Sequence, residues 1–239
     1  MRIDILTLFP EMIDGLFHGM IGRGTRAGAL DIRTHNIRDY TADKHGRCDD
    51  YTFGGGEGML MTAQPICDCI EAVDPDRKAR RIYMSPCGKL FKQETARELA
   101  AHAWLVILCG RYEGVDRRAI DLCIDEEISV GDYVLTGGEL PAMIVADCVA
   151  RLQPGVLGNA ESAVNESFEG GLLEYPQYTR PAVFRGLAAP EVLLSGDHER
   201  IRVWRGARRA ELTKRNRPDL YRKYLKGKKE EAEEVKGKK

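Results

Sequence analysis

The sequence lacks the features that mark membrane, secreted and zinc-binding proteins. No apolar run approaches the roughly 20 residues that a membrane span needs, and residues 1–4 begin a strand pattern rather than a signal peptide. The seven cysteines are an odd number without a CxxC pair, and Cys67-x-Cys69 has no histidine cluster beside it. We therefore expect reduced, buried thiols in a cytoplasmic protein, with no membrane association and no metal site.

Several catalytic signatures are also missing. There is no GxSxG turn and no paired Cys and His, and no Lys-Ser/Thr follows the glycines of residues 54–58 as it would in a Walker loop. Residues 22–27 match GxGxxA by letter but follow a helical pattern, whereas a dinucleotide-binding fingerprint follows a strand. The five histidines are scattered. A hydrolase or a dehydrogenase therefore has no supporting motif.

What the sequence does contain is an alternation of strands and helices. Short apolar or alternating runs predict strands over residues 2–9, 30–36, 81–85, 105–109 and 127–134. Helical spacing predicts helices over residues 11–21, 63–73, 91–103, 116–123 and 142–152, with Pro65 and Pro141 tolerated in first turns. This order is typical of an α/β fold whose parallel sheet is covered on both faces.

Glycine-rich loops stand out in this pattern. Three of them follow strands within residues 107–158, where small ligands dock in α/β proteins. A further stretch, residues 49–61, holds Gly54, Gly55, Gly56 and Gly58. Its backbone could approach a ligand closely, but a mobile surface loop explains the composition equally well.

The net charge of −1 hides a strong asymmetry. Residues 200–229 contain thirteen Lys and Arg but only Glu211 and Asp219 as acids, so this segment carries +11 and the remainder −12. The segment predicts a polyanionic partner, although a solvated helix face would have a similar composition. Residues 153–170 are small and polar and read as a linker. Two hypotheses stay open: an enzyme that acts on nucleic acid with a small cofactor, and a nucleic-acid-binding module.

An ordered set of strings narrows this choice. The strings are DD at residues 49–50, GGGEGM at 54–59, SPCG at 85–88, CGRYEGVD at 109–116, SVGDYVLTGGELP at 129–141, PGVLG at 154–158, YTRP at 178–181 and LLSG at 193–196. Together they resemble the bacterial tRNA (guanine-N1)-methyltransferases of the SPOUT class, and the resemblance extends from near the N-terminus to about residue 220.

The resemblance implies an α/β fold in which the parallel sheet carries a deep trefoil knot, within residues 83–152, and a small C-terminal helical domain. Residues 1–158 would form the knotted catalytic domain, residues 159–172 a flexible linker, and residues 173–239 a basic, mainly helical tRNA-binding domain. The knot would hold S-adenosylmethionine. The residues that the resemblance assigns to this cofactor are Tyr83, Met84, Ser85, Pro86, Gly110, Tyr112, Gly114, Ser129, Val130, Gly131, Asp132, Tyr133, Val134, Leu135, Gly137, Gly138 and Pro141.

The implied reaction is methylation of N1 of guanosine 37 in tRNA. N1 is protonated at neutral pH, so a carboxylate would remove its proton and a cation would stabilise the charge that develops at O6. The family's base aligns with Glu166 and its cation with Arg151. Aspartate is the usual base in the family. Cys87 replaces an expected Gln, and Thr52-Phe53 replaces Pro-Tyr.

The resemblance further implies a homodimer with an active site shared between subunits. It also implies a use of Mg²⁺, for which the sequence offers no dedicated site. Related knotted methyltransferases that act on other tRNA or rRNA positions, and an RNA-binding protein without catalysis, remain alternatives. The residues expected to contact tRNA are Asp50, Gly55, Arg180, Arg205, Arg208, Arg209, Lys214 and Arg215.

Overall fold

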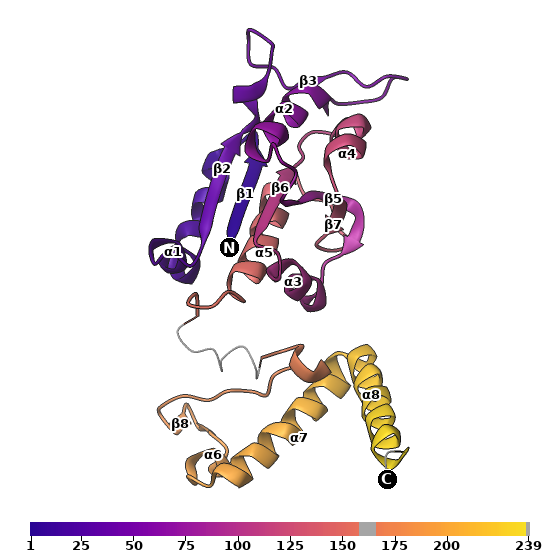
Figure 1. The fold of residues 1–239 in the computed structure, drawn as a ribbon. Helices are drawn as coiled ribbons and strands as arrows, with labels where there is room; N and C mark the ends of the chain where they lie inside the picture. Colours follow the sequence, from indigo (N-terminus) through magenta and orange to yellow (C-terminus); the bar gives the residue numbers. More distant parts are fainter. Residues whose placement is uncertain (158–165, 238–239) are drawn as a thin grey trace. The chain divides into compact units, whose positions relative to one another are not determined.

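The computed structural model describes residues 1–157 and 166–237, and the chain divides into two compact units, Met1–Gly158 and Asn159–Lys239 (Figure 1). The first unit contains a five-stranded sheet in the order β2-β1-β6-β5-β7, and every neighbouring pair is parallel. The predicted parallel sheet is therefore confirmed. Its strands are β1 (Arg2–Thr7), β2 (Asp31–Asn36), β5 (Arg80–Leu90), β6 (Trp104–Cys109) and β7 (Glu126–Ser129).

Helices cover both faces of this sheet, because alternate strand residues point to opposite sides. Ile5 and Ile107 join a core with η1 (Pro10–Phe17), α1 (Gly19–Arg26), α3 (Gln93–Ala100) and α5 (Glu139–Ala150). Leu6 and Leu108 join a second core. That core includes η2 (Ile37–Tyr40), α2 (Ala63–Val73) and α4 (Arg117–Cys123). The prediction of a helix over residues 63–73 is correct to the residue.

The helix expected over residues 11–21 is wrong as a single element. The chain forms the 3-10 helix η1, leaves helical geometry at His18 (ψ 157°), and restarts as α1 after Gly19, whose φ is +71°. A left-handed glycine breaks the helical path that the apolar spacing alone predicted. The GxGxxA letters fall within and just after α1, so they form no phosphate-binding turn.

Among the strands, β1 ends at Thr7 rather than at residue 9, β2 and β6 differ by one residue at their starts, and the ends of β5 and β7 differ most from expectation. β5 does not stop at Pro86 but continues to Leu90, with a register shift against β7 between Met84 and Lys89. Such a bulge tolerates proline because its residues make no ladder hydrogen bonds. β7 ends at Ser129 rather than at residue 134. Residues 130–138 form a loop beyond the strand end instead.

The second unit is mainly helical. It contains η4 (Glu169–Gly171), a hairpin of β8 (Val183–Phe184) and β9 (Leu187–Ala188), α6 (Glu191–Leu194), α7 (His198–Asn216) and α8 (Pro218–Gly237). Leu172 and Thr213 are buried at the junction of η4 and α7. Within residues 1–157 and 166–237, no helix is long and apolar enough to cross a membrane.

Of the seven cysteines, all are free, and Cys48, Cys69, Cys109 and Cys123 are buried as expected. Cys87 is exposed instead, because it lies on the bulge of β5 rather than in the ladder.

Candidate active site

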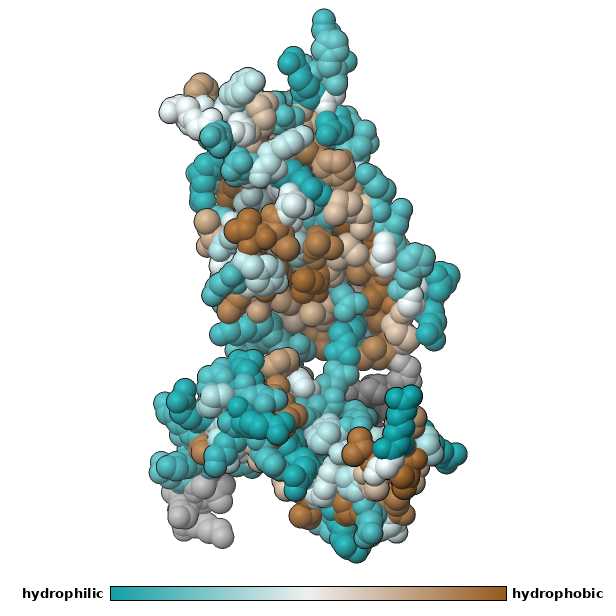
Figure 2. All heavy atoms as spheres, turned by 180° about the vertical axis from the view of Figure 1, so that it is seen from behind, coloured by the Kyte–Doolittle hydropathy of each residue, from teal (hydrophilic) through white to brown (hydrophobic). Residues whose placement is uncertain are grey.

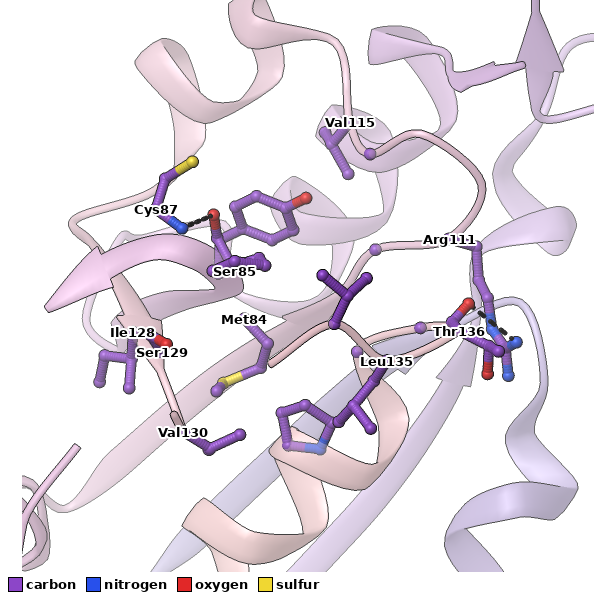
Figure 3. Close-up of a pocket in the computed structure, with 18 of the residues that line it drawn as sticks. Met84, Ser85, Cys87, Arg111, Val115, Ile128, Ser129, Val130, Leu135 and Thr136 are labelled. Carbon is purple, nitrogen blue, oxygen red and sulfur yellow. Dashed lines mark hydrogen bonds between the residues drawn. The ribbon is translucent and has the colours of Figure 1, made fainter. Parts of the chain in front are cut away.

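A pocket of about 420 Å³ opens at the carboxyl ends of β5, β6 and β7. This is the edge of a parallel sheet where ligands bind in α/β folds. Three segments, residues 83–87, 110–115 and 128–138, supply its wall, together with Pro141. Figure 3 shows side chains from all three converging around the cavity. Every residue expected from the resemblance to hold the cofactor lines this pocket except Asp132.

Six lining residues were not expected. Five of them lie inside strings that the sequence analysis singled out and the sixth, Ile128, directly precedes one, so proximity to the assigned residues was the signal that could have found them. They are Cys87, Arg111, Glu113, Val115, Ile128 and Thr136.

The pocket loops cross at very short range. The Gly138 N–H donates to the Gly110 carbonyl at 2.8 Å. A Cβ atom on Gly138 would lie 2.7 Å from the Cys109 Cα and 2.8 Å from the Gly110 nitrogen. Both are main-chain atoms, which cannot rotate away as a flexible side chain could. Glycine at 138 is therefore required by the crossing of the two loops.

We expect Gly138→Ala to lower the melting temperature by several degrees, because overpacking against main chain costs about 1–3 kcal/mol. Gly206→Ala is the matched control. A Cβ there meets nothing within 4 Å, and alanine is favoured over glycine inside α7. Thermal melts of both variants check this, and an unchanged Gly138→Ala melt would show that the crossing can relax.

A buried charged network ties the pocket to the sheet. Glu139, 1% exposed, accepts a hydrogen bond from the Thr7 hydroxyl at 2.6 Å, and its other oxygen lies 3.0 Å from the Arg111 Nε. The Arg111–Glu139 pair is a charge contact without hydrogen-bond alignment. The Arg111 guanidinium also lies over the Phe9 ring at 4.5 Å. These contacts hold the loop after β6 against the start of α5.

The pocket wall is rich in aromatic and apolar surface. Burial raises the pKa of Tyr83 to about 12, so its phenol stays neutral beside Gly110 and Gly114. Tyr112 (47%), Tyr133 (52%) and Val134 (87%) are exposed at the rim. Large apolar side chains left in solvent around a pocket are typical of a ligand site.

The glycine-rich stretch between β3 (Asp49–Asp50) and β4 (Leu60–Met61) adjoins this pocket. The C-terminal end of this stretch is fixed to the pocket loop, since the Met61 N–H donates to the Gly114 carbonyl at 3.0 Å. Gly58, which has no side chain, leaves room for the Glu113 carboxylate. Gly54 and Gly55 have φ of +86° and +79°, and Phe53 is 97% exposed. Asp50 and Gly55, expected at tRNA, are both exposed.

The two expected catalytic residues belong to different units. Arg151 is half-buried at the C-terminal cap of α5, where its N–H donates to the Asp147 carbonyl at 3.0 Å. Glu166 is the first described residue of the second unit. Residues 159–165, half of the expected linker, lie outside the described residues, as does residue 158 before it.

In the second unit several expected tRNA-contacting residues also contact the chain itself. Arg205 lies over the Tyr175 ring at 4.7 Å, Arg208 pairs with Glu211 at 2.5 Å, and Arg209 Nε donates to the Leu173 carbonyl at 3.2 Å. The Arg215 Nε donates to the Asn216 side chain at 3.2 Å. Of the expected residues in this unit, all but the half-buried Arg209 are exposed. Within the described residues, no group of three His, Cys, Asp or Glu side chains could hold a metal ion.

Comparison with known proteins gives one consistent result. A family model described as tRNA (Guanine-1)-methyltransferase TrmD matches residues 1–223. The chain is 53% identical over 229 residues to the tRNA (guanine-N(1)-)-methyltransferase of Lachnospira eligens, covering 95% of this chain and 97% of the relative. It is 54% identical to the enzymes of the same name from Clostridium botulinum strain Hall (224 residues; 94% and 93%) and Clostridium beijerinckii (223 residues; 93% of each). The similarity therefore covers nearly the full length of the chain and not only the separate strings. The chain belongs to the tRNA (guanine-N1)-methyltransferase family.

Proposed function

We propose that this enzyme transfers a methyl group from S-adenosylmethionine to N1 of guanosine 37 in tRNA, in the cytoplasm. The observation that carries the proposal is the pocket at the sheet edge, whose lining matches the expected cofactor residues in a chain of this family. S-adenosylmethionine, when bound, supplies an electrophilic methyl group. The remaining chemistry falls to the side chains and the backbone of the protein.

The pocket suits such a cofactor in size and in lining. Its volume of about 420 Å³ lies within the roughly 300–1,000 Å³ of small-molecule sites. The glycine-containing loops at residues 110–115 and 128–138 bring main chain up to the cavity, and main-chain N–H and C=O groups can read the edge of an adenine ring. Val130, Val134 and Leu135 supply apolar surface for its faces. We infer that the residues assigned to the cofactor, other than Asp132, hold it.

Two residues would act on guanine. Glu166 would accept the N1 proton and so create the nucleophile, while the Arg151 guanidinium would stabilise negative charge at O6. The second unit would carry Glu166, and its exposed Arg180, Lys214 and Arg215 would meet tRNA phosphates. The glycine-rich loop with Asp50 and Gly55 would contact the RNA next to the pocket.

A trefoil knot would explain why the chain is so crowded at this site. Gly138 leaves no room for a Cβ beside the Cys109 backbone, and Gly88 leaves none beside the Glu127 carbonyl carbon, only 2.3 Å from such an atom. β5 also pairs with both β6 and β7, so the chain returns to one strand from two sides. These approaches support a chain that threads through its own loop within residues 83–152.

Apolar surface on α5 supports the homodimer. This helix is apolar apart from Glu139 and Asp147, yet Leu140 is 50% and Ile144 41% exposed, with Met12 of η1 37% exposed. Figure 2 shows hydrophobic side chains gathered on one face of the first unit. An exposed apolar face of this kind is suited to pack against a second copy of the chain. Because it lies on α5, which leads into Arg151, such packing would bring two active sites together.

We expect Ile144→Arg to convert the dimer to a monomer and to abolish methyl transfer, because the charge would have to be buried without a partner. Leu122→Arg is the matched control, since Leu122 is 65% exposed on α4, which covers the other face of the sheet. Sedimentation of both variants provides the measurement. A dimeric Ile144→Arg protein would remove this face from the interface.

Cys87 provides a probe of the cofactor pocket. It is exposed, lines the cavity, and its N–H donates to the Ser85 hydroxyl at 3.2 Å (Figure 3). We expect S-adenosylmethionine to slow alkylation of Cys87 by N-ethylmaleimide at least tenfold, since a bound ligand would cover the thiol. Peptide mass spectrometry with and without the cofactor measures this, and Cys148 in α5 is the internal reference. Equal rates would place the cofactor away from the β5 bulge.

Methyl transfer from labelled S-adenosylmethionine to unmodified tRNA tests the function directly. A transcript with guanine at position 37 should acquire label as 1-methylguanosine, and the same transcript with adenine there should not. Label in both would indicate another target nucleotide, as in related knotted enzymes. Cofactor-independent RNA binding without any label would indicate a binding protein instead.

A further inference from the structure

Helix α7 presents two adjoining stripes, and the first one holds the second unit together. Arg205, Arg209 and Thr213 are four residues apart and therefore share a face. The Arg205 guanidinium lies over the Tyr175 ring at 4.7 Å, and the Arg209 Nε donates to the Leu173 carbonyl. The buried Thr213 hydroxyl accepts from the Leu173 N–H at 2.8 Å. This stripe packs the incoming chain onto the helix.

The second stripe lines a hollow. Trp204, Arg208, Glu211 and Arg215 follow one another at spacings of four, three and four residues, so they also share a face. The opposite wall includes Tyr178, and the enclosed volume is about 280 Å³. We call this hollow the Tyr178–Trp204 notch. It lies within the second unit and is distinct from the cofactor pocket.

The aromatic rings and the guanidinium group of the notch are suited to hold one flat ring. The Tyr178 and Trp204 rings lie 6.4 Å apart at 59°, and the Arg208 guanidinium carbon lies 6.0 Å from the Trp204 ring centre. Tyr178 is 51% exposed although it is large and aromatic. Unstacked RNA bases are held on such aromatic faces and guanidinium planes. The volume is small for a whole cofactor but admits a single base.

The charged residues of the notch indicate which kind of base it would bind. The α7 wall of the notch belongs to residues 200–229, the segment with thirteen Lys and Arg and only two acids, so a polyanion is attracted to it. One of those two acids, Glu211, lines the notch, held in place by Arg208 at 2.5 Å. A carboxylate accepts more than one hydrogen bond and suits the adjacent N1–H and N2–H donors of guanine. Adenine presents an acceptor at N1 and would be disfavoured.

We propose that the Tyr178–Trp204 notch binds one unstacked guanine of the RNA substrate, a nucleotide other than the one methylated in the cofactor pocket. The base would lie against the two rings, Glu211 would accept from its N1–H and N2–H, and Arg215 would meet a neighbouring phosphate. The inference rests on the proposed function only in that the partner is tRNA. It adds a second point at which the enzyme reads sequence.

Trp204 itself reports on the notch. The protein has only two tryptophans, Trp104 in the first unit and Trp204. The Trp204 fluorescence is the difference between the emission of the wild type and that of Trp204→Phe. Stacking of a base on the Trp204 indole should quench this difference. We expect the pentanucleotide UUGUU to quench it at least fivefold more strongly than UUAUU at equal concentration. The preference should disappear in Glu211→Gln.

Binding of tRNA provides the second measurement. Tyr178→Leu keeps apolar bulk but removes a stacking face, so the Kd for tRNA should rise about tenfold. Phe184→Leu is the matched control. Its ring is 60% exposed beneath Arg185 but does not line the notch, so the Kd should stay within twofold. If the Trp204 fluorescence is unaffected by RNA, or changes equally with the two pentanucleotides, the proposal that the notch binds guanine is wrong.

Methyl transfer, measured on the same preparations, separates this inference from the proposed function. If the enzyme is active but its Trp204 fluorescence does not respond to guanine, only the proposal that the notch binds guanine is refuted. A protein that neither binds tRNA nor transfers a methyl group would refute the proposed function, and the notch with it.

Discussion

Replacing Glu166 by glutamine is expected to lower kcat for methyl transfer by about 10²–10⁴-fold, the contribution of a general base. The amide keeps the size of the side chain but cannot accept the N1 proton. Single-turnover methylation of tRNA measures this, with tRNA binding followed in parallel. The binding should stay near that of wild type, since the substitution removes no contact to the phosphates. Near-normal turnover would mean that another group takes the proton.

The structure shows how Glu166 would be held although its neighbours upstream are not described. Immediately after it, the Ser167 hydroxyl accepts from the Glu174 N–H at 3.0 Å, and the Phe168 N–H donates to the Leu172 carbonyl at 2.8 Å. Phe168 has φ of +76°, a left-handed conformation that is uncommon for such a residue. Glu166 therefore enters a tight turn that is fixed on the second unit.

This turn supplies the controls for Glu166. Glu166→Asp restores the usual carboxylate of the family one methylene shorter, and we expect it to retain far more activity than Glu166→Gln. Glu174→Gln removes a carboxylate from the same turn without a role in proton transfer, so its kcat should equal that of wild type. A loss in Glu174→Gln as large as in Glu166→Gln would show that the turn, and not the proton acceptor, had been damaged.

The sheet could be predicted from sequence because its strands form short apolar or alternating runs that are separated by helical patterns. Strand β6 is an example: five buried residues end at Gly110. The loop after β7 could not be predicted from periodicity, since residues 130–134 were expected to extend that strand and yet leave the sheet. Only contacts remote in sequence, such as Gly138 against Cys109, determine that path.

The site shows the same division. Resemblance assigned most of the pocket lining, but Arg111 and Glu139 were missed because their role depends on Thr7, more than a hundred residues away in the chain. A mainly helical second domain was expected, but that expectation could not separate the two stripes of α7. Whether a side chain such as Arg209 packs on its own chain or faces a partner is decided by the segment at residues 173–178, which has no periodicity to read.

Arg151→Ala is expected to lower kcat by about 10²–10³-fold while cofactor binding stays near normal. The reason is that charge stabilisation of this kind acts mainly in the transition state, where O6 becomes negative. Arg151 follows α5 rather than lining the cofactor pocket, so its loss should leave the pocket wall intact. Equilibrium binding of S-adenosylmethionine and single-turnover methylation together make the measurement.

Two further variants make the Arg151 result specific. Arg151→Lys keeps a cation but loses the planar fork of donors, so we expect an intermediate kcat. Arg33→Ala removes an exposed arginine of the same unit, paired with Asp31 at 2.8 Å on β2, and should leave turnover unchanged. If Arg151→Ala weakened cofactor binding as much as turnover, the side chain would support the pocket rather than the reaction. If its turnover matched that of Arg33→Ala, Arg151 would have no part in the chemistry, and the cation at O6 would have to come from another basic residue.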